Sequence, residues 1–453
     1  MPFIEGYLNT LSAAPGETVQ LHASSNSDRC TATIIREGYP ERVVHIEQNI
    51  PIEEHPIPGQ SWLTGPGWPV CWTFTVPRDW TSGVYRIELS AEGVRNQPTH
   101  THWGRRLASQ NLLLVVRAAR PAEQHNILLQ LTTNTSIAYN SWGGRSLYAY
   151  NSFDKVQSAR VSLLRPGHGY YDGCPFPAWE RPFVHWCERE GYGLDYAINY
   201  DLERWPDGFD QYRLILSVGH DEYWSAPMRD HLERFIANGG NAAFFSGNSV
   251  CWQVRFEDEG KTMVSYKEHY KQDPKYASGE HALLSTLWSH PLVGRPENRL
   301  TGVGFPMGGY HLSHGSYMDG LGEYTVRRAA HWVFEGTCLT EGDVFGGRNT
   351  IVGYETDGCA YVERDGYPVP TGTDGTPEGF TILAQCPSAW AGHEIEADVF
   401  KEARVAKQGM ATMGLYTRGG TVFTAGTTDW SHGLKDDSVV QQITRNVLNR
   451  LGT

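Results

Sequence analysis

The chain has 453 residues, of which 40% are hydrophobic and 20% are charged, and this composition excludes an intrinsically disordered protein. The length favours two domains over one. The formal net charge of −13 argues against nucleic acid or an anionic membrane as a partner.

The start of the chain has no basic region followed by an apolar run, and nowhere is an apolar stretch long enough to cross a bilayer. We therefore expect a cytoplasmic protein that does not span a membrane. The eight cysteines are scattered and form no CxxC pair, which argues against a zinc finger or a thioredoxin-like site. Reduced, buried thiols are the expected state.

Residues 1–118 show the alternation that is typical of β-strands. Val19, Leu21 and Ala23 are separated by polar residues and follow a Pro-Gly turn signal. Segment 83–91 repeats this alternation. The pattern predicts an N-terminal β-sandwich of immunoglobulin-like size.

From residue 119 the pattern changes to short apolar runs that alternate with a helix. Runs at 126–131, Leu214–Val218 and Ala242–Phe245 suit strands that are buried on both faces. Between the last two, Ser225 is a suitable N-cap, and Gly239 and Gly240 terminate the helix. Its apolar stripe consists of Met228, Leu232, Phe235 and Ile236.

This strand–helix–strand order predicts an α/β domain with a parallel sheet at residues 119–453. A last helix is expected at Ser438–Leu451. The predicted chain is thus an α+β protein of two domains, in which the second resembles class I glutamine amidotransferase-like folds.

Three polar segments follow the predicted buried strands, at 134–152, 219–225 and 246–252. Ligands of open parallel sheets gather at the carboxyl ends of the strands, so we expect these segments to converge there. In GHDEYWS (219–225), a carboxylate and an imidazole could supply a metal ligand and a proton shuttle. The alternative is that Asp221 or Glu222 only favours the helix N-terminus electrostatically.

Taken together, these segments resemble the N,N-dimethylformamidase large (beta) subunit family. The resemblance rests on SGVYRIEL (82–89), AYNSWGGRSLY (138–148), GHDEYWS (219–225), FFSGNSVCW (244–252), VSYK (264–267), GYETDG (353–358) and GGTVFTAGTTDW (419–430). Two departures are expected: an additional N-terminal β-domain of the family's enzyme is absent, and the connection at 96–111 is longer than usual.

The resemblance implies one iron ion bound by Tyr85, Tyr139 and Glu222. Two phenolates and one carboxylate would balance the charge of ferric iron, and hard oxygen donors suit a hard ion. Three protein ligands leave positions for water and substrate, as in catalytic metal sites. A tyrosine taken alone is more often a packing residue, so this assignment depends on the resemblance.

The resemblance further implies that His220 handles a proton, that Asn248 donates to an oxyanion, and that Lys267 is a basic residue near the site. We therefore expect an iron-dependent hydrolase that cleaves the C–N bond of a small, formamide-type amide through metal-activated water. Its partners would be the amide substrate and further copies of the chain. Whether a small accessory subunit is needed stays open.

Two other functions stay open. The first is hydrolysis of a different small amide. The second is a non-catalytic carbohydrate- or small-molecule-binding protein on a glutamine amidotransferase-like scaffold, with a platform formed by Trp142, Trp224, Trp252 and Trp430. A cysteine nucleophile is disfavoured, because Cys251 is the only thiol near the polar segments and no cysteine occupies the turn after Val218.

Overall fold

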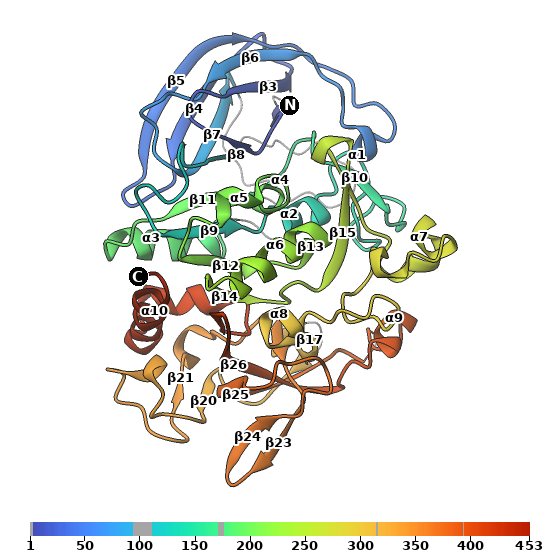
Figure 1. The fold of residues 1–453 in the computed structure, drawn as a ribbon. Coiled ribbons are helices and arrows are strands. Elements are labelled where there is room, and N and C mark those ends of the chain that lie inside the picture. Colours follow the sequence, from blue (N-terminus) through green and yellow to red (C-terminus); the bar gives the residue numbers. More distant parts are fainter. Residues whose placement is uncertain (1–2, 94–110, 171–175, 314–315, 393) are drawn as a thin grey trace. The chain divides into compact units, whose positions relative to one another are not determined.

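The computed structural model describes residues 3–93, 111–170, 176–313, 316–392 and 394–453, and Figure 1 shows its fold. Most of the long connection at 96–111 lies outside the described residues. The chain forms two compact units. The first unit comprises 1–125, 133–204 and 255–265, and the second comprises 126–132, 205–254 and 266–453. The predicted domains at 1–118 and 119–453 stay a prediction, because compactness alone does not show where independently folding parts end.

Two sheets form the β-rich part of the first unit. One sheet has the order β1-β3-β6, with bounds Ile4–Leu8, Thr18–Ser25 and Val70–Thr75. The other has the order β2-β8-β7-β4-β5, with bounds Ser12–Ala13, Asn111–Val116, Gly83–Ala91, Arg29–Arg36 and Arg42–Pro51. Val19, Leu21 and Ala23 are fully buried, as their alternation predicts, and they share one core with Ile34 and Ile87 of the second sheet. The expected β-rich N-terminal region is confirmed.

The rest of the first unit consists of short elements. They are α1 (Ser61–Thr64), α2 (Thr133–Tyr139), β10 (Arg160–Ser162), α3 (Glu180–Arg189), β11 (Asp195–Ile198), α4 (Asn199–Arg204), η1 (Asp258–Gly260) and β16 (Thr262–Val264). β15 (Trp252–Glu257) runs from the second unit into the first.

The second unit is built on a mixed sheet with the order β9-β12-β14-β27-β26-β25-β20-β21. The bounds are Ile127–Leu131, Leu214–His220, Asn241–Gly247, Gly420–Thr424, Gln408–Arg418, Thr381–Ala389, Tyr324–Val326 and Val344–Phe345. β12 pairs in parallel with β9 and β14, and β14 pairs in parallel with β27. Because His220 pairs with Gly247, the polar segments after β12 and β14 leave the sheet at the same edge.

The two helices predicted in this part of the chain are confirmed. α6 (Ala226–Ala237) begins after Ser225, whose side chain accepts a hydrogen bond from the Met228 amide. All four residues of its predicted apolar stripe are buried. α10 spans Ser438–Leu451 and is capped by Asp437, which accepts from two backbone amides of its first turn.

Short elements complete the second unit. They are α5 (Pro206–Phe209), β13 (Tyr223–Ser225), η2 (Lys267–Gln272), α7 (Pro274–Ala277), η3 (His281–Leu283), α8 (Asn298–Thr301), β17 (Gly304–Gly309), β18 (Leu312–Ser313), β19 (Ser316–Tyr317), η4 (Trp332–Phe334), η5 (Gly347–Asn349), β22 (Thr356–Gly358), β23 (Tyr361–Arg364), β24 (Tyr367–Pro370), α9 (Asp398–Glu402) and η6 (Trp430–Lys435). The chain is therefore a mixed α+β protein, as predicted. Among the described residues, every helix is too short or too polar to cross a membrane.

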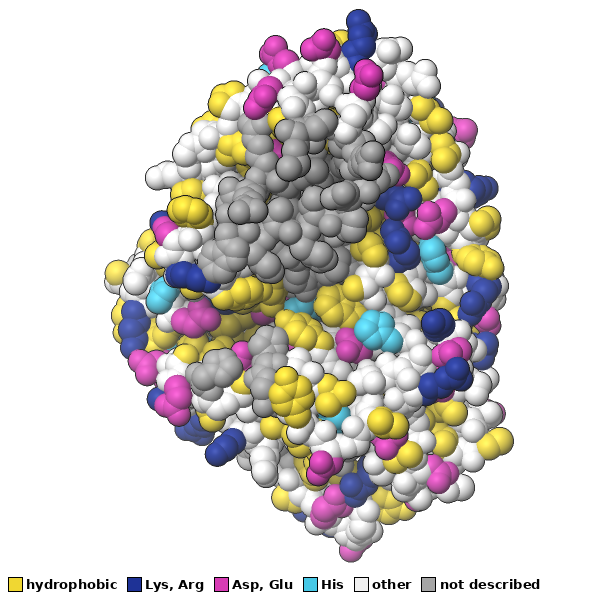
Figure 2. Space-filling model, turned by 180° about the vertical axis from the view of Figure 1, so that it is seen from behind, with side chains coloured by type: hydrophobic (Ala, Val, Ile, Leu, Met, Phe, Trp, Pro, Cys, Tyr) yellow, Lys and Arg dark blue, Asp and Glu magenta, His cyan; other side chains and the backbone are white. Residues whose placement is uncertain are grey.

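On one face of the structure, charged side chains of both signs are interspersed (Figure 2). On the face in Figure 2, Lys and Arg side chains alternate with Asp and Glu side chains around its rim. The chain as a whole has a net charge of −13. On this face, the acidic side chains of the described residues are spread out and form no single acidic patch.

Candidate functional site

The candidate site begins at the carboxyl end of β12, where three polar residues follow the buried apolar run. Gly219 has a φ of 83°, a conformation that glycine adopts without steric cost. His220 and Asp221 are fully buried and Glu222 is 2% exposed. Buried ionisable groups need partners, so their contacts define what the site can do.

His220 is the centre of a cluster of four buried side chains. Its Nε2 atom lies 2.6 Å from Oε2 of Glu355 and 3.3 Å from Oε2 of Glu222. The Nδ2 atom of Asn248 lies 3.2 Å from Oε2 of Glu355 and 3.5 Å from Nε2 of His220. Because Nε2 faces two carboxylate oxygens, we assign a proton to this nitrogen. We call His220, Glu222, Asn248 and Glu355 the polar cluster.

The turn after β14 fixes Asn248. Asn248 and Val250 have positive φ angles of 49° and 57°, which is unusual for a β-branched residue such as Val250. The amides of Val250 and Trp252 donate to the carbonyls of Asp221 and Glu222, and these bonds join the turn to the segment after β12. The Oδ1 atom of Asn248 is buried and has no hydrogen-bond partner among the described residues. An orphaned buried acceptor beside a strained turn is typical of a functional site.

Glu222 and Asp221 have different surroundings. Oε1 of Glu222 accepts a hydrogen bond from the Trp252 indole at 2.8 Å, while its other oxygen faces His220. Oδ2 of Asp221 accepts from Gln130 at 2.9 Å and from Ser217 at 2.8 Å. Asp221 therefore joins β9 to β12 inside the second unit. Ser225, and neither carboxylate, caps helix α6.

Lys267 lies in the same unit and is buried beside aromatic rings. Its Nζ atom is 4.7 Å from the centre of the Trp252 ring and 5.8 Å from that of Tyr223. Burial lowers the pKa of Lys267, and the carboxylates of Glu268 and Glu222 oppose this effect. Lys267 therefore lies within electrostatic reach of the polar cluster.

The sequence-based assignment missed Glu355 and Asp357. Both lie in GYETDG (353–358), one of the segments that resemble the family. Burial raises the pKa of Asp357 to about 7, although its carboxylate accepts a hydrogen bond from the Ser249 amide at 3.1 Å. The only signal in the sequence was a pair of acidic residues between glycines, which is common in loops.

Tyr85 and Tyr139 belong to the first unit and have different surroundings. Tyr85 is 1% exposed in the core between the two sheets, where it stacks on Trp80 and its hydroxyl donates to the Thr81 carbonyl at 2.9 Å. Tyr139 is the last residue of α2, and its ring centre lies 4.2 Å from that of Tyr148. Their assignment as iron ligands stays a prediction.

The tryptophan platform of the alternative function is not formed. All four tryptophans are buried, each with at most 4% of its surface exposed, because they pack inside the two units. Cys251 is buried too, and burial raises the pKa of its thiol well above the ordinary value. A thiol without access or ionisation is a poor nucleophile, in line with the expectation from the sequence.

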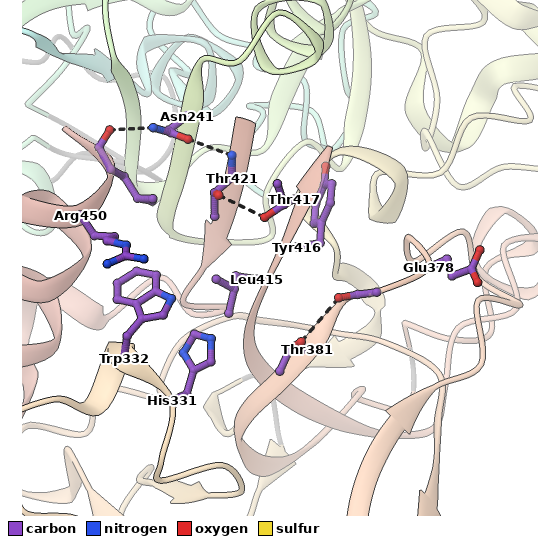
Figure 3. Close-up of a pocket in the computed structure, with 12 residues that line it drawn as sticks. Asn241, His331, Trp332, Glu378, Thr381, Leu415, Tyr416, Thr417, Thr421 and Arg450 are labelled. Carbon is purple, nitrogen blue, oxygen red and sulfur yellow. Dashed lines mark hydrogen bonds between the residues drawn. The ribbon is translucent and has the colours of Figure 1, made fainter. Parts of the chain in front are cut away.

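A separate cavity of about 500 Å³ lies at the opposite edge of the sheet, where β14 and β27 begin (Figure 3). Asn241 joins its walls, since its side chain donates to the Leu451 carbonyl and accepts from the Thr421 amide, both at 2.8 Å. Trp332 and Arg450 form another wall (Figure 3). This cavity is distinct from the polar cluster, which lies where β12 and β14 end.

Comparisons with known proteins point to one family. The family model described as "N,N-dimethylformamidase beta subunit-like, C-terminal" matches residues 31–444. An N,N-dimethylformamidase beta subunit from Alcaligenes sp is 23% identical over 325 residues, which are 64% of this chain and 39% of that protein. The chain thus spans less than half of the curated relative.

One solved structure, a family 123 glycoside hydrolase from Clostridium perfringens, aligns with a TM-score of 0.11 and 8% identity over 55% of this chain and 72% of that one. A similarity this low has no bearing on the fold or the function.

Proposed function

The chain belongs to the N,N-dimethylformamidase beta subunit-like family, and from this premise we propose that it hydrolyses the C–N bond of a small, formamide-type amide. One observation supports this proposal above the others. Nε2 of a buried imidazole lies 2.6 Å from a carboxylate oxygen of Glu355 and 3.3 Å from one of Glu222, and the Asn248 amide nitrogen lies 3.5 Å from the same atom. Amide hydrolysis needs a proton for the departing amine and a donor for the oxyanion.

In this proposal each member of the polar cluster has one role. His220 holds the proton at Nε2 and delivers it to the amine nitrogen as the C–N bond breaks. Asn248 donates from Nδ2 to the oxygen that gains negative charge. Glu355 orients the imidazole and stabilises its charged form, as its 2.6 Å contact with Nε2 allows. Lys267 adds positive charge beside the cluster.

The family resemblance implies iron, and the donors of the polar cluster fit a hard cation. Glu222 and Glu355 offer carboxylate oxygens, and Oδ1 of Asn248 is a buried oxygen without a hydrogen-bond partner among the described residues. We propose Glu222 as a ligand of ferric iron, with Tyr85 and Tyr139 as the further ligands that the resemblance implies. When bound, the ion would polarise the substrate carbonyl and lower the pKa of a water molecule.

Tyr85 is the weakest member of this ligand set. Its hydroxyl already donates to the Thr81 carbonyl within the sheet core, and burial raises the pKa of its phenol. Binding iron as a phenolate would require Tyr85 to give up this hydrogen bond. The test of the ligand set therefore compares Tyr85→Phe with Tyr139→Phe.

Turnover of small amides by iron-loaded protein tests the proposal. With N,N-dimethylformamide as substrate, water cleaves the C–N bond and the products are formate and dimethylamine, which are both measurable. Formamide and a bulkier amide serve as further substrates. Glu222→Gln should lose both iron and turnover, whereas Glu47→Gln, which replaces a half-exposed side chain, should keep both. Iron-loaded wild-type protein that cleaves none of these amides would overturn the proposal.

The curated relative is a beta subunit, so we propose that this chain also works within an assembly of several chains. Further copies of the chain are the expected partners, with or without a small accessory subunit, and the cytoplasm is the proposed location. Light scattering of the purified chain gives its mass in solution. A monomer with full amidase turnover would contradict the need for an assembly.

The proposed scaffold of the second unit resembles class I glutamine amidotransferase-like folds. The parallel order of β9, β12, β14 and β27 supports this assignment, because such folds place their site beyond the carboxyl ends of parallel strands. His220 and Asn248 follow adjacent strands at that edge.

A further inference from the structure

The first unit contains a compact group of potential metal ligands that is separate from the polar cluster. Glu37, Glu41 and His185 each offer one ligand atom, and these three atoms lie within 4.8 Å of one another. Glu37 and Glu41 lie in the connection between β4 and β5, and His185 lies on α3. Carboxylate oxygens and imidazole nitrogens are both ligands of zinc in proteins.

The two elements that hold these residues are fixed to each other. Arg36 donates two hydrogen bonds to the carboxylate of Glu188 on α3, at 2.7 and 3.1 Å, and the Tyr39 amide donates to it at 2.7 Å. Glu188 lies three residues after His185, so both face the same side of the helix. The carboxylates therefore face His185 without any rearrangement of the chain.

Gly38 leaves room for the Arg36–Glu188 pair. A Cβ atom at residue 38 would lie 1.8 Å from Nη1 of Arg36 and 2.4 Å from a carboxylate oxygen of Glu188, so these two flexible side chains would have to shift. The sequence EGYPE thus combines two carboxylates with a glycine that leaves this pair undisturbed.

Two polar atoms of the group have no hydrogen-bond partner within the described part of the chain. Glu37 is 1% exposed, and its Oε1 atom contacts Arg181 at 2.6 Å and Arg86 at 3.3 Å. Its Oε2 atom and the Nε2 atom of His185 are buried and have no hydrogen-bond partner among the described residues. A buried carboxylate oxygen and a buried ring nitrogen each cost free energy when unpaired. A cation held by these side chains would supply a partner for such atoms.

We propose that Glu37, Glu41 and His185 bind one divalent cation of the zinc type. An imidazole ligand favours Zn²⁺ over Mg²⁺ and Ca²⁺, which prefer oxygen donors. Three arginines, Arg36, Arg86 and Arg181, offset the charges of the nearby carboxylates. Affinity must therefore come from coordination and not from excess negative charge, which again favours zinc.

The state of His185 suits this role. Burial and the neighbouring guanidinium of Arg181 lower the pKa of its imidazole, which favours the neutral form that a metal ligand needs. A bound ion would join the β4–β5 connection to α3, and its role would be structural. This proposal does not depend on the proposed amidase activity.

Zinc binding by the full chain tests the proposal. Equilibrium dialysis with elemental analysis gives the stoichiometry, and calorimetric titration with Zn²⁺ gives the Kd. We expect His185→Gln to bind one zinc ion fewer than wild type. We expect Glu41→Gln, which replaces a side chain that is 38% exposed, to raise the Kd at least about tenfold.

His45→Gln is the matched control. His45 lies on β5 of the same unit and is 44% exposed, with its Nε2 atom 3.5 Å from a carboxylate oxygen of Glu47, so its loss should change neither stoichiometry nor Kd. If His185→Gln does not fold, Glu41→Gln decides. Equal zinc binding by wild type and Glu41→Gln, or by wild type and a folded His185→Gln, would overturn the proposal. Iron content and amidase turnover are measured separately, so failure here leaves the proposed function untouched.

Discussion

Nε2 of His220 and Oε2 of Glu355 lie 2.6 Å apart, although β12 and the segment before β22 are distant in the chain. This contact gives the imidazole an acceptor for its proton. Glu222 faces the same nitrogen at 3.3 Å and also accepts from Trp252. The two carboxylates therefore differ: Glu355 is the main partner of His220, and Glu222 is shared between His220 and an indole.

We predict that Glu355→Gln lowers kcat for amide hydrolysis by about 100-fold or more. Glutamine keeps the size of the side chain, but it cannot stabilise a charged imidazole as a carboxylate does. Steady-state kinetics on the best small amide measures the effect. Glu363→Gln, an exposed residue paired with Arg327, is the matched control and should leave kcat unchanged. An unchanged kcat in Glu355→Gln would remove Glu355 from the mechanism.

We predict that Asp221→Asn destabilises the fold by about 1–3 kcal/mol. The carboxylate accepts from Gln130 and Ser217, and replacing it with a neutral amide weakens both hydrogen bonds while leaving the volume unchanged. Urea unfolding measures the loss as a lower midpoint. Asp207→Asn, at the start of helix α5, is a comparison in the same unit. A midpoint equal to that of wild type would show that this buried carboxylate is dispensable.

Local signals predicted the helices and the ends of the buried strands. The Ser225 cap and the apolar stripe of α6 depend on residues within a few positions of one another, so the sequence contains all the information needed. The βαβ rule then placed His220 and Asn248 at one sheet edge, because both follow parallel strands that are neighbours.

The rest of the site depends on distant contacts. Glu355 is 107 residues from Asn248 in the chain. It lies directly before β22, which pairs with β17 in an antiparallel arrangement that is not part of the βαβ pattern. No periodicity in the sequence indicates such a contact. For Tyr85, the alternation of its strand correctly predicts burial. The alternation gives no information on the partner of the hydroxyl, which in the structure is the Thr81 carbonyl.

We predict that Glu297→Gln stabilises the protein at alkaline pH. Both carboxylate oxygens of Glu297 are buried without a hydrogen-bond partner among the described residues, and burial raises its pKa from 4.5 to about 8. Folding therefore favours the protonated form. The contribution of this group to stability is complete below about pH 4.5 and is lost as the pH rises through about 8.

The size of this effect is at most roughly 5 kcal/mol, because one pKa unit corresponds to about 1.4 kcal/mol. Urea unfolding of wild type and Glu297→Gln measures the difference. The pH is varied from about 5 to about 9, because the stability loss falls mostly within this range. The two proteins should converge at the acidic end. Glu378→Gln, an exposed carboxylate, should follow wild type throughout. A Glu297→Gln protein that is no more stable than wild type at the alkaline end would contradict the prediction.

We predict that Arg165→Lys destabilises the first unit by about 2–4 kcal/mol. Arg165 is fully buried, and burial lowers its pKa to about 9. Its guanidinium donates to four backbone carbonyls at 2.9–3.1 Å, those of Ile137, Trp142, Arg145 and Ser162. A lysine ammonium has three donors at one point and cannot reach four carbonyls in different directions.

In the sequence, Ile137 precedes Tyr139 and Trp142 follows it, and Arg165 binds the carbonyls of both. Arg165 therefore also fixes the end of α2, where Tyr139 is the last residue. If Tyr139 is an iron ligand, Arg165→Lys should lower the bound iron per chain as well as the urea midpoint. Arg160→Lys, which replaces a half-exposed arginine paired with Glu257 in the same unit, should change neither quantity. A loss of stability with full iron content would assign Arg165 to folding alone and would count against Tyr139 as a ligand.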